Sequence, residues 1–173
     1  LHIEFVRWQD RINAETERGL ELEEILGYHL EQAHRYLSEL GPLDEQGVAI
    51  GADAARRLAG AGKRAFARGD MHAAANLYRR AIALLDANDT RRLPLLPEFV
   101  EVLLEVGDFA LARSVLAEAR AAAERAANQR IAALTRLLRI RIRIFSAESG
   151  DLAEEMLGIT NETIPLFEAE QAH

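Results

Sequence analysis

Cysteine is absent from the chain, and lysine, aromatic residues and long apolar runs are scarce. Without cysteine the protein can form no disulfide, thiolate nucleophile or cysteine-metal site. No apolar run approaches the ~20 residues that a membrane-spanning helix needs. Lys63 is the only lysine among 21 basic residues, a bias typical of a GC-rich bacterial genome. We therefore expect a cytoplasmic bacterial protein without a membrane partner.

The net charge of −7 argues against broad contact with nucleic acid or anionic membrane, because both need a positive field on the protein. A length of 173 residues suits one compact domain or a short stack of helical repeats. The hydrophobic fraction of 49 % excludes a wholly disordered chain. Alanine supplies much of that fraction, which indicates closely packed helices.

Two amphipathic helices are predicted at the start of the chain. The first carries an apolar stripe and is expected to end at Gly19; the stripe consists of Leu1, Phe5, Trp8 and Ile12. A second stripe runs from Leu22 to Leu40. Gly41-Pro42 then stops the helix, because the residue before a proline disfavours the helical conformation.

A Gly-Asp pair recurs between helical patterns in the rest of the chain, at Gly69-Asp70, Gly107-Asp108 and Gly150-Asp151. Glycine can adopt the positive φ angle that a helix end commonly needs, and aspartate can cap the following helix. The recurrence predicts repeated helical hairpins.

The residues around the first two pairs resemble the tetratricopeptide repeat. That pattern places small residues where the two helices of a hairpin touch and bulky ones between successive hairpins. The first unit supplies Leu58, Gly62, Ala65, Ala74, Tyr78 and Ala81, and the second supplies Leu96, Leu103, Ala112, Leu116 and Ala119. The resemblance implies an all-α fold in which antiparallel helical hairpins stack as a right-handed α-solenoid.

The third unit departs from the pattern, because Glu155 and Glu162 stand where small residues are expected. The turns are also 38 and 43 residues apart, against ~34 in a regular repeat, and we expect longer helices in the third unit. The predicted organisation is a non-repeat helical pair followed by three tetratricopeptide-like units. The ranges are 1–43 for the pair and 44–173 for the repeats, which divide at about 44–91, 92–127 and 128–173.

Basic and apolar residues alternate from Arg139 to Phe145, which taken alone is a strand pattern. The flanking residues 128–138 favour a helix instead. The wider stretch holds five arginines in an acidic protein, at positions 130, 136, 139, 141 and 143. They predict either a nucleic-acid patch or internal pairing with the seven acidic residues between Glu148 and Glu170, and the sequence leaves both open.

The candidate chemical sites favour packing over catalysis. His29 and His34 are five residues apart, too far round a helix to share a metal ion. The stretch from Gly60 to Arg64 superficially resembles a phosphate loop, but it has no hydroxyl at Arg64 and no glycine at Arg57. No grouping for nucleophilic, acid-base or metal catalysis stands out. We expect no enzyme activity, no cofactor and no metal.

The segment from Glu24 to Ala33, EILGYHLEQA, with the following Leu40-Gly41-Pro42, resembles a stretch of large bacterial signalling proteins. In those proteins a nucleotidyl cyclase or a LuxR-type DNA-binding domain is joined to a STAND-type ATPase and then to tetratricopeptide-like helices. The resemblance implies a C-terminal regulatory arm. Because the sequence starts at Leu1 rather than Met, we expect a piece of such a protein, without its catalytic parts.

The tetratricopeptide resemblance also implies a concave groove lined by the first helix of each hairpin. The positions carried over are Arg56, Lys63, Phe66, Glu101, Leu104 and Glu105. The expected function is a non-catalytic protein-interaction and regulatory module that binds a protein or peptide, including domains of the same parent chain. The alternatives are an inducer-sensing superhelix of a transcriptional regulator and nucleic-acid binding through Arg136–Arg143.

Overall fold

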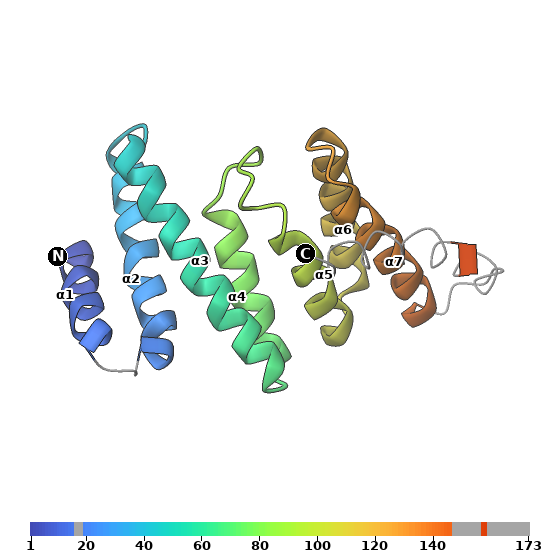
Figure 1. Cartoon of the computed structure of the whole chain (residues 1–173), viewed down its shortest axis with the longest axis horizontal. Coiled ribbons are helices and arrows are strands. Elements are labelled where there is room, and N and C mark those ends of the chain that lie inside the picture. Colours follow the sequence, from blue (N-terminus) through green and yellow to red (C-terminus); the bar gives the residue numbers. More distant parts are fainter. Residues whose placement is uncertain (16–18, 147–156, 159–173) are drawn as a thin grey trace. The chain divides into compact units, whose positions relative to one another are not determined.

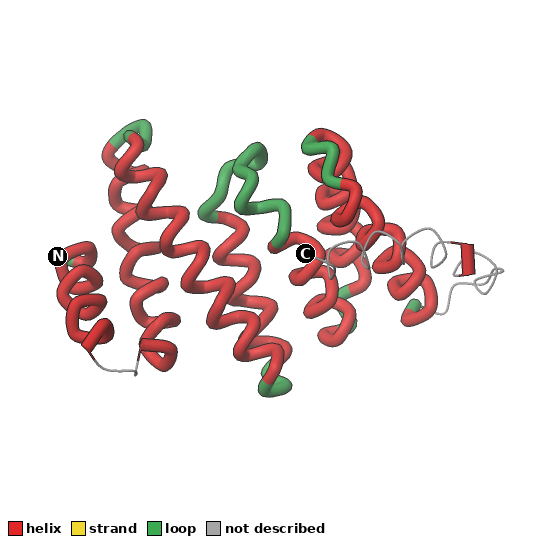
Figure 2. The backbone as a smooth tube through the Cα atoms, viewed as in Figure 1, coloured by secondary structure: helices red, strands yellow, loops and turns green. Residues whose placement is uncertain are grey.

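The computed structural model describes residues 1–15, 19–146 and 157–158. Over these residues the chain is all-helical, as predicted, and contains no strand (Figures 1 and 2). It forms two compact units, Leu1–Arg91 and Arg92–His173, called unit 1 and unit 2 below. The finer division at residues 43 and 127 stays a prediction.

Unit 1 contains four helices: α1 (His2–Glu15), α2 (Gly19–Leu40), α3 (Glu45–Ala67) and α4 (Met71–Ala83). Each helix packs against the next one along the chain. Helix α2 ends before Gly41-Pro42, as the sequence predicts. The predicted role of Gly19 is wrong, because Gly19 is the first residue of α2. Glycine is accepted at helix starts as well as after helix ends.

Small residues set how closely the helices of unit 1 approach. A Cβ atom added to Gly62 of α3 would lie 3.1 Å from the ring of Tyr78 in α4. One added to Gly27 of α2 would lie 3.1 Å from the side chain of Leu58 in α3. Leu58 is fully buried. Gly62 therefore packs closely on Tyr78 within a hairpin, and residues 60–64 are part of the continuous helix α3.

The buried face of α1 differs from the predicted one. Val6 of α1 lies in the core, with Ile3 packed beside it. Leu1, Phe5 and Trp8 of the predicted stripe are exposed. The periodicity of α1 shows that the helix is amphipathic. It does not determine which side of the helix packs against α2, because that depends on tertiary packing.

Unit 2 contains α5 (Leu95–Val106), α6 (Phe109–Arg125) and α7 (Gln129–Phe145). Helix α7 packs against both α6 and α5. The predicted helix across residues 139–145 is confirmed. The expectation of longer helices in the third unit is not confirmed, because α7 has 17 residues, as α6 has, against 12 in α5 and 23 in α3. Buried side chains from all three helices form the core, among them Leu96, Val100, Leu103, Ala119, Leu138 and Ile140.

The two described Gly-Asp turns have the same geometry. Gly69 and Gly107 both have φ +83°, a left-handed conformation that costs glycine least. Asp70 then accepts a hydrogen bond from the Ala73 amide and Asp108 one from the Leu111 amide, at 3.1 and 3.0 Å. Both predicted roles are confirmed at these turns, whereas Gly150-Asp151 lies outside the described residues.

A third turn of this kind, which the sequence reading missed, joins α6 to α7. Ala127 has φ +50° where the other turns have glycine. Asn128 accepts a hydrogen bond from the Ile131 amide at 3.0 Å and caps α7. Asn128 could have predicted the start of α7 from the sequence, because asparagine is among the preferred N-cap residues.

Candidate partner-binding surfaces

Three residues predicted to line a groove, Arg56, Lys63 and Phe66, lie on α3 in unit 1. Their spacing of seven and three residues places them on one side of the helix. Arg56 and Lys63 are exposed and Phe66 is half-buried. This side of α3, called the α3 face below, combines two cationic side chains with part of an aromatic ring.

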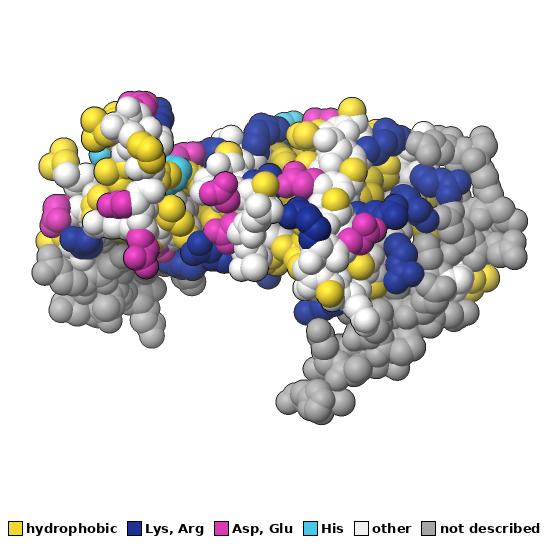
Figure 3. Space-filling model, turned by 90° about the horizontal axis from the view of Figure 1, so that it is seen from above, with side chains coloured by type: hydrophobic (Ala, Val, Ile, Leu, Met, Phe, Trp, Pro, Cys, Tyr) yellow, Lys and Arg dark blue, Asp and Glu magenta, His cyan; other side chains and the backbone are white. Residues whose placement is uncertain are grey.

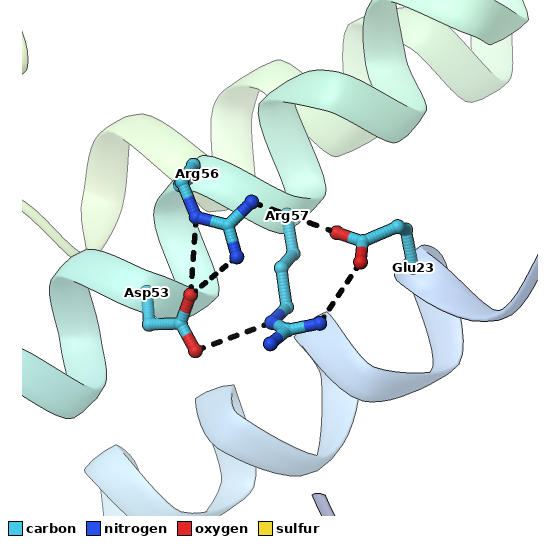
Figure 4. Close-up of polar contacts among 4 residues, drawn as sticks. All are labelled: Glu23, Asp53, Arg56 and Arg57. Atoms are coloured by element: carbon cyan, nitrogen blue, oxygen red, sulfur yellow. Dashed lines mark hydrogen bonds and ion pairs between the residues drawn. The ribbon is translucent and has the colours of Figure 1, made fainter. Parts of the chain in front are cut away.

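Arg56 is held in place by a charged network between α2 and α3 (Figure 4). Its Nε donates a hydrogen bond to Asp53 Oδ1 at 3.1 Å. The next residue, Arg57, is only 6 % exposed; its Nη1 lies 2.9 Å from Glu23 Oε1 and its Nε 3.2 Å from Asp53 Oδ2. The two carboxylates neutralise the buried guanidinium and tie α3 to α2. The sequence reading missed this network, because Glu23 is 34 residues before Arg57.

A second ion pair joins α2 to α4 within unit 1. The Arg80 guanidinium donates hydrogen bonds to both carboxylate oxygens of Glu31, with its Nε 3.1 Å from each. The side chains are 25 % and 21 % exposed. The hydrogen bonds that Arg80 donates to Glu31 raise the pKa of Arg80, so this guanidinium stays charged. This contact fixes α4 relative to a helix that is not its neighbour in the chain.

In unit 2 the predicted groove residues of α5 contact α7. Arg141 Nη1 lies 3.2 Å from Glu101 Oε1, and its Nη2 lies 3.7 Å from Glu105 Oε1. Leu104 is buried in the core. Glu101 and Glu105 therefore form one side of an ion-paired contact between α5 and α7. Their binding to a partner stays a prediction.

A groove of about 870 Å³ lies along α6 and α7, wholly within unit 2. Among the residues that the structure describes, five arginines line it, at positions 113, 120, 136, 139 and 143, together with the acidic Glu124. Apolar surface in the groove comes from Leu116 and Ile142 and from the smaller side chains of Ala117, Ala121, Ala132 and Thr135. Figure 3 shows basic side chains next to hydrophobic ones on the part of the surface that belongs to these helices.

Histidine and aromatic rings gather where α1 meets α2. The Nδ1 atoms of His2 and His29 are 2.9 Å apart, a hydrogen bond that needs one proton between the two nitrogens. The ring of Phe5 stacks edge-on against His29 with centroids 4.7 Å apart, and Tyr36 stacks on His2 at 5.9 Å. Burial, followed by the charge of His2, lowers the pKa of His29. His29 is therefore a half-buried, hydrogen-bonded histidine.

Metal binding and membrane insertion find no support in the described part of the chain. Within residues 1–15, 19–146 and 157–158, no three acidic or histidine side chains are grouped so that they could hold a metal ion. No helix in those ranges has both the length and the apolar surface to cross a bilayer.

Comparison of the chain with known protein families, with curated proteins and with solved structures finds no match.

Proposed function

We propose that the chain is a non-catalytic protein-interaction and regulatory module built from tetratricopeptide-like hairpins. The observation that carries the proposal is the repeated turn. Gly69-Asp70 and Gly107-Asp108 have matching φ angles and matching aspartate caps, and each joins two antiparallel helices. A repeated hairpin exposes extended helix faces whose main use is to bind other chains.

The packing around these turns supports the tetratricopeptide likeness. The alanine four residues after each capping aspartate, Ala74 and Ala112, is completely buried. In unit 2, α5 contacts α7 through Arg141, as the first helices of consecutive repeats would. Gly62 packing on Tyr78 is the close approach that the repeat pattern requires.

The α3 face is the surface that we assign to the partner. Lys63 attracts an acidic group, the half-buried Phe66 ring offers apolar contact, and Arg56 is already oriented by Asp53. A cationic surface with an aromatic side chain suits a protein segment, because aromatic side chains carry much of the affinity of such interfaces. The partner class is a peptide or helix with an acidic residue close to an apolar one.

The stretch from Glu24 to Ala33 supports a place in a multidomain bacterial signalling ATPase. Within it, Glu31 holds Arg80 of α4 and His29 holds α1, so this part of α2 links three helices of unit 1. In this proposal, a partner that binds to the surface of the arm changes the activity of the ATPase and output domains. Inducer sensing and nucleic-acid binding stay predictions, for which a thermal-shift screen and a salt titration are the respective tests.

The test uses the parent protein with substitutions on the α3 face. Phe66→Ala together with Lys63→Glu should weaken binding of the regulatory partner by ~2 kcal/mol or more, as loss of an interface anchor does. Asn76→Ala, at an exposed position of α4, is the matched control and should leave affinity unchanged. Equal affinity for both variants and the unchanged protein would refute the assignment.

A further inference from the structure

Gly60 of α3 is not explained by packing within unit 1. Close packing favours glycine at four other positions, where an added Cβ atom would lie 2.6 to 3.1 Å from another side chain: Gly27, Gly47, Gly51 and Gly62. A Cβ atom at Gly60 would meet only Arg64 Nη1, at 3.5 Å, an ordinary contact distance. Glycine destabilises the interior of a helix relative to alanine, so the fold alone gives no reason for glycine at position 60.

Gly60 lies on the α3 face, between Arg56 and Lys63. The spacings of four and three residues place all three on one side of the helix. The direction that a Cβ atom would take from Gly60 is open except for the Arg64 guanidinium, and Arg56 and Lys63 are exposed. The backbone of α3 is therefore uncovered at this point of the face, where any other residue would carry a side chain.

Cationic side chains lie close to the uncovered backbone. No acidic residue occurs from Ala54 to Gly69. Within the described part of unit 1, ion pairs form at Arg7, Arg35, Arg56, Arg57, Arg80 and Arg91. Lys63 and Arg64 are not among these residues, so their charges are available to a carboxylate of the partner, with which arginine forms strong hydrogen bonds.

We propose that Gly60 determines which segments the α3 face accepts: those with a small residue, glycine, alanine or serine, close to a carboxylate. The inference deepens the proposed function and rests on the α3 face being the partner surface. A helix backbone without a side chain allows the close approach of another chain, and a large partner residue at this point would hold the two backbones apart. The carboxylate of the segment then pairs with Lys63 and Arg64, and its apolar residue packs against Phe66.

The experiment selects short random peptides from a display library on the full chain. Counter-selection against the variant with Lys63→Glu and Phe66→Ala retains only the peptides that need the α3 face. The dissociation constants of synthetic copies of these peptides are then measured with the unchanged chain and with Gly60→Ala. The variant should bind about ten-fold more weakly, as an added methyl group in a close contact does. Asn76→Ala, an exposed change to alanine on α4, is the matched control and should leave the dissociation constants unchanged.

Unfolding does not produce this result, because Gly60→Ala should stabilise α3. Leucine in place of the small residue of the peptide should weaken binding to the unchanged chain to a similar degree. Equal affinity for the unchanged chain and for Gly60→Ala would overturn the role of Gly60 and leave the α3 face standing as the partner surface. Retained peptides that lack a carboxylate near a small residue would also overturn the inference. If counter-selection retains no peptide, the α3 face is not the partner surface, and the proposed function and the inference fail together.

Discussion

Removal of the Arg57 side chain should destabilise unit 1 far more than removal of its neighbour Arg56. Both guanidinium groups use the carboxylates of Glu23 and Asp53 (Figure 4). Their environments differ, since the Arg57 side chain is 6 % exposed and that of Arg56 is 63 % exposed. Charge pairing is worth much more where water cannot screen it.

The expected magnitudes follow from this difference in burial. Breaking a buried ion pair by removing one partner costs about 3–5 kcal/mol. Because Glu23 and Asp53 are themselves 19 % and 37 % exposed, they recover part of their hydration, and Arg57→Ala should cost about 3 kcal/mol. Arg56→Ala loses only an exposed pair, and its cost should be about 0.5 kcal/mol.

Urea unfolding measures both effects. Trp8 is the only tryptophan and lies in α1 of unit 1, so its fluorescence reports on this unit, and circular dichroism follows the whole chain. The Arg57 variant should lower the urea midpoint with little change in slope. Replacing Arg57, Glu23 and Asp53 together by apolar residues of similar size should restore much of the loss, because no buried charge is then left unpaired. Equal costs for Arg56→Ala and Arg57→Ala would refute the reasoning.

Three further predictions concern the histidine pair, the third turn and the glycines of α3. The pKa of His29 is lowered in the folded state, so the unfolded chain binds more protons than the folded one. The free energy of unfolding should therefore fall as the pH drops from about 7 through the folded pKa of His29. Denaturation measured at several pH values should show that His29→Gln reduces this dependence. Ala127→Gly should raise the free energy of unfolding by about 1 kcal/mol, because Ala127 has φ +50°; a decrease would contradict the strained turn. Gly60→Ala should raise the free energy of unfolding in urea by up to about 1 kcal/mol, since the added Cβ would meet only Arg64 Nη1 at 3.5 Å. Gly62→Ala should raise it less or lower it, because the added Cβ would lie 3.1 Å from the Tyr78 ring.

Local signals in the sequence predicted the helices and their ends well. The cap at Asp108 and the turn at Gly107 depend on residues within a few positions of one another, so spacing alone identifies them. The helical interpretation of residues 139–145 was correct for a related reason, because α7 begins at Gln129 and its flanking pattern is helical.

Tertiary features were predicted less well. Which face of α1 is buried depends on where α2 lies, and Val6 rather than Trp8 enters the core. The pairs Glu31–Arg80 and Arg141–Glu101 join residues 49 and 40 positions apart. Many carboxylates could have paired with each arginine, and only the packing of the helices selects one. The groove along α6 and α7 likewise appears only when two helices are placed side by side.

Site-specific photo-crosslinking from Lys63 tests the central claim most directly. In one variant of the parent protein a photoreactive residue replaces Lys63 on the α3 face, and in a control variant it replaces Asn76 on α4. Both positions are exposed, and the crosslinking is done in the cells that produce the protein. The account predicts a covalent adduct with one defined protein or parent domain from position 63, none from position 76, and loss of the adduct with Phe66→Ala. Identical adducts from both positions, or an adduct from position 63 that Phe66→Ala leaves unchanged, would contradict the assignment of this face to a partner.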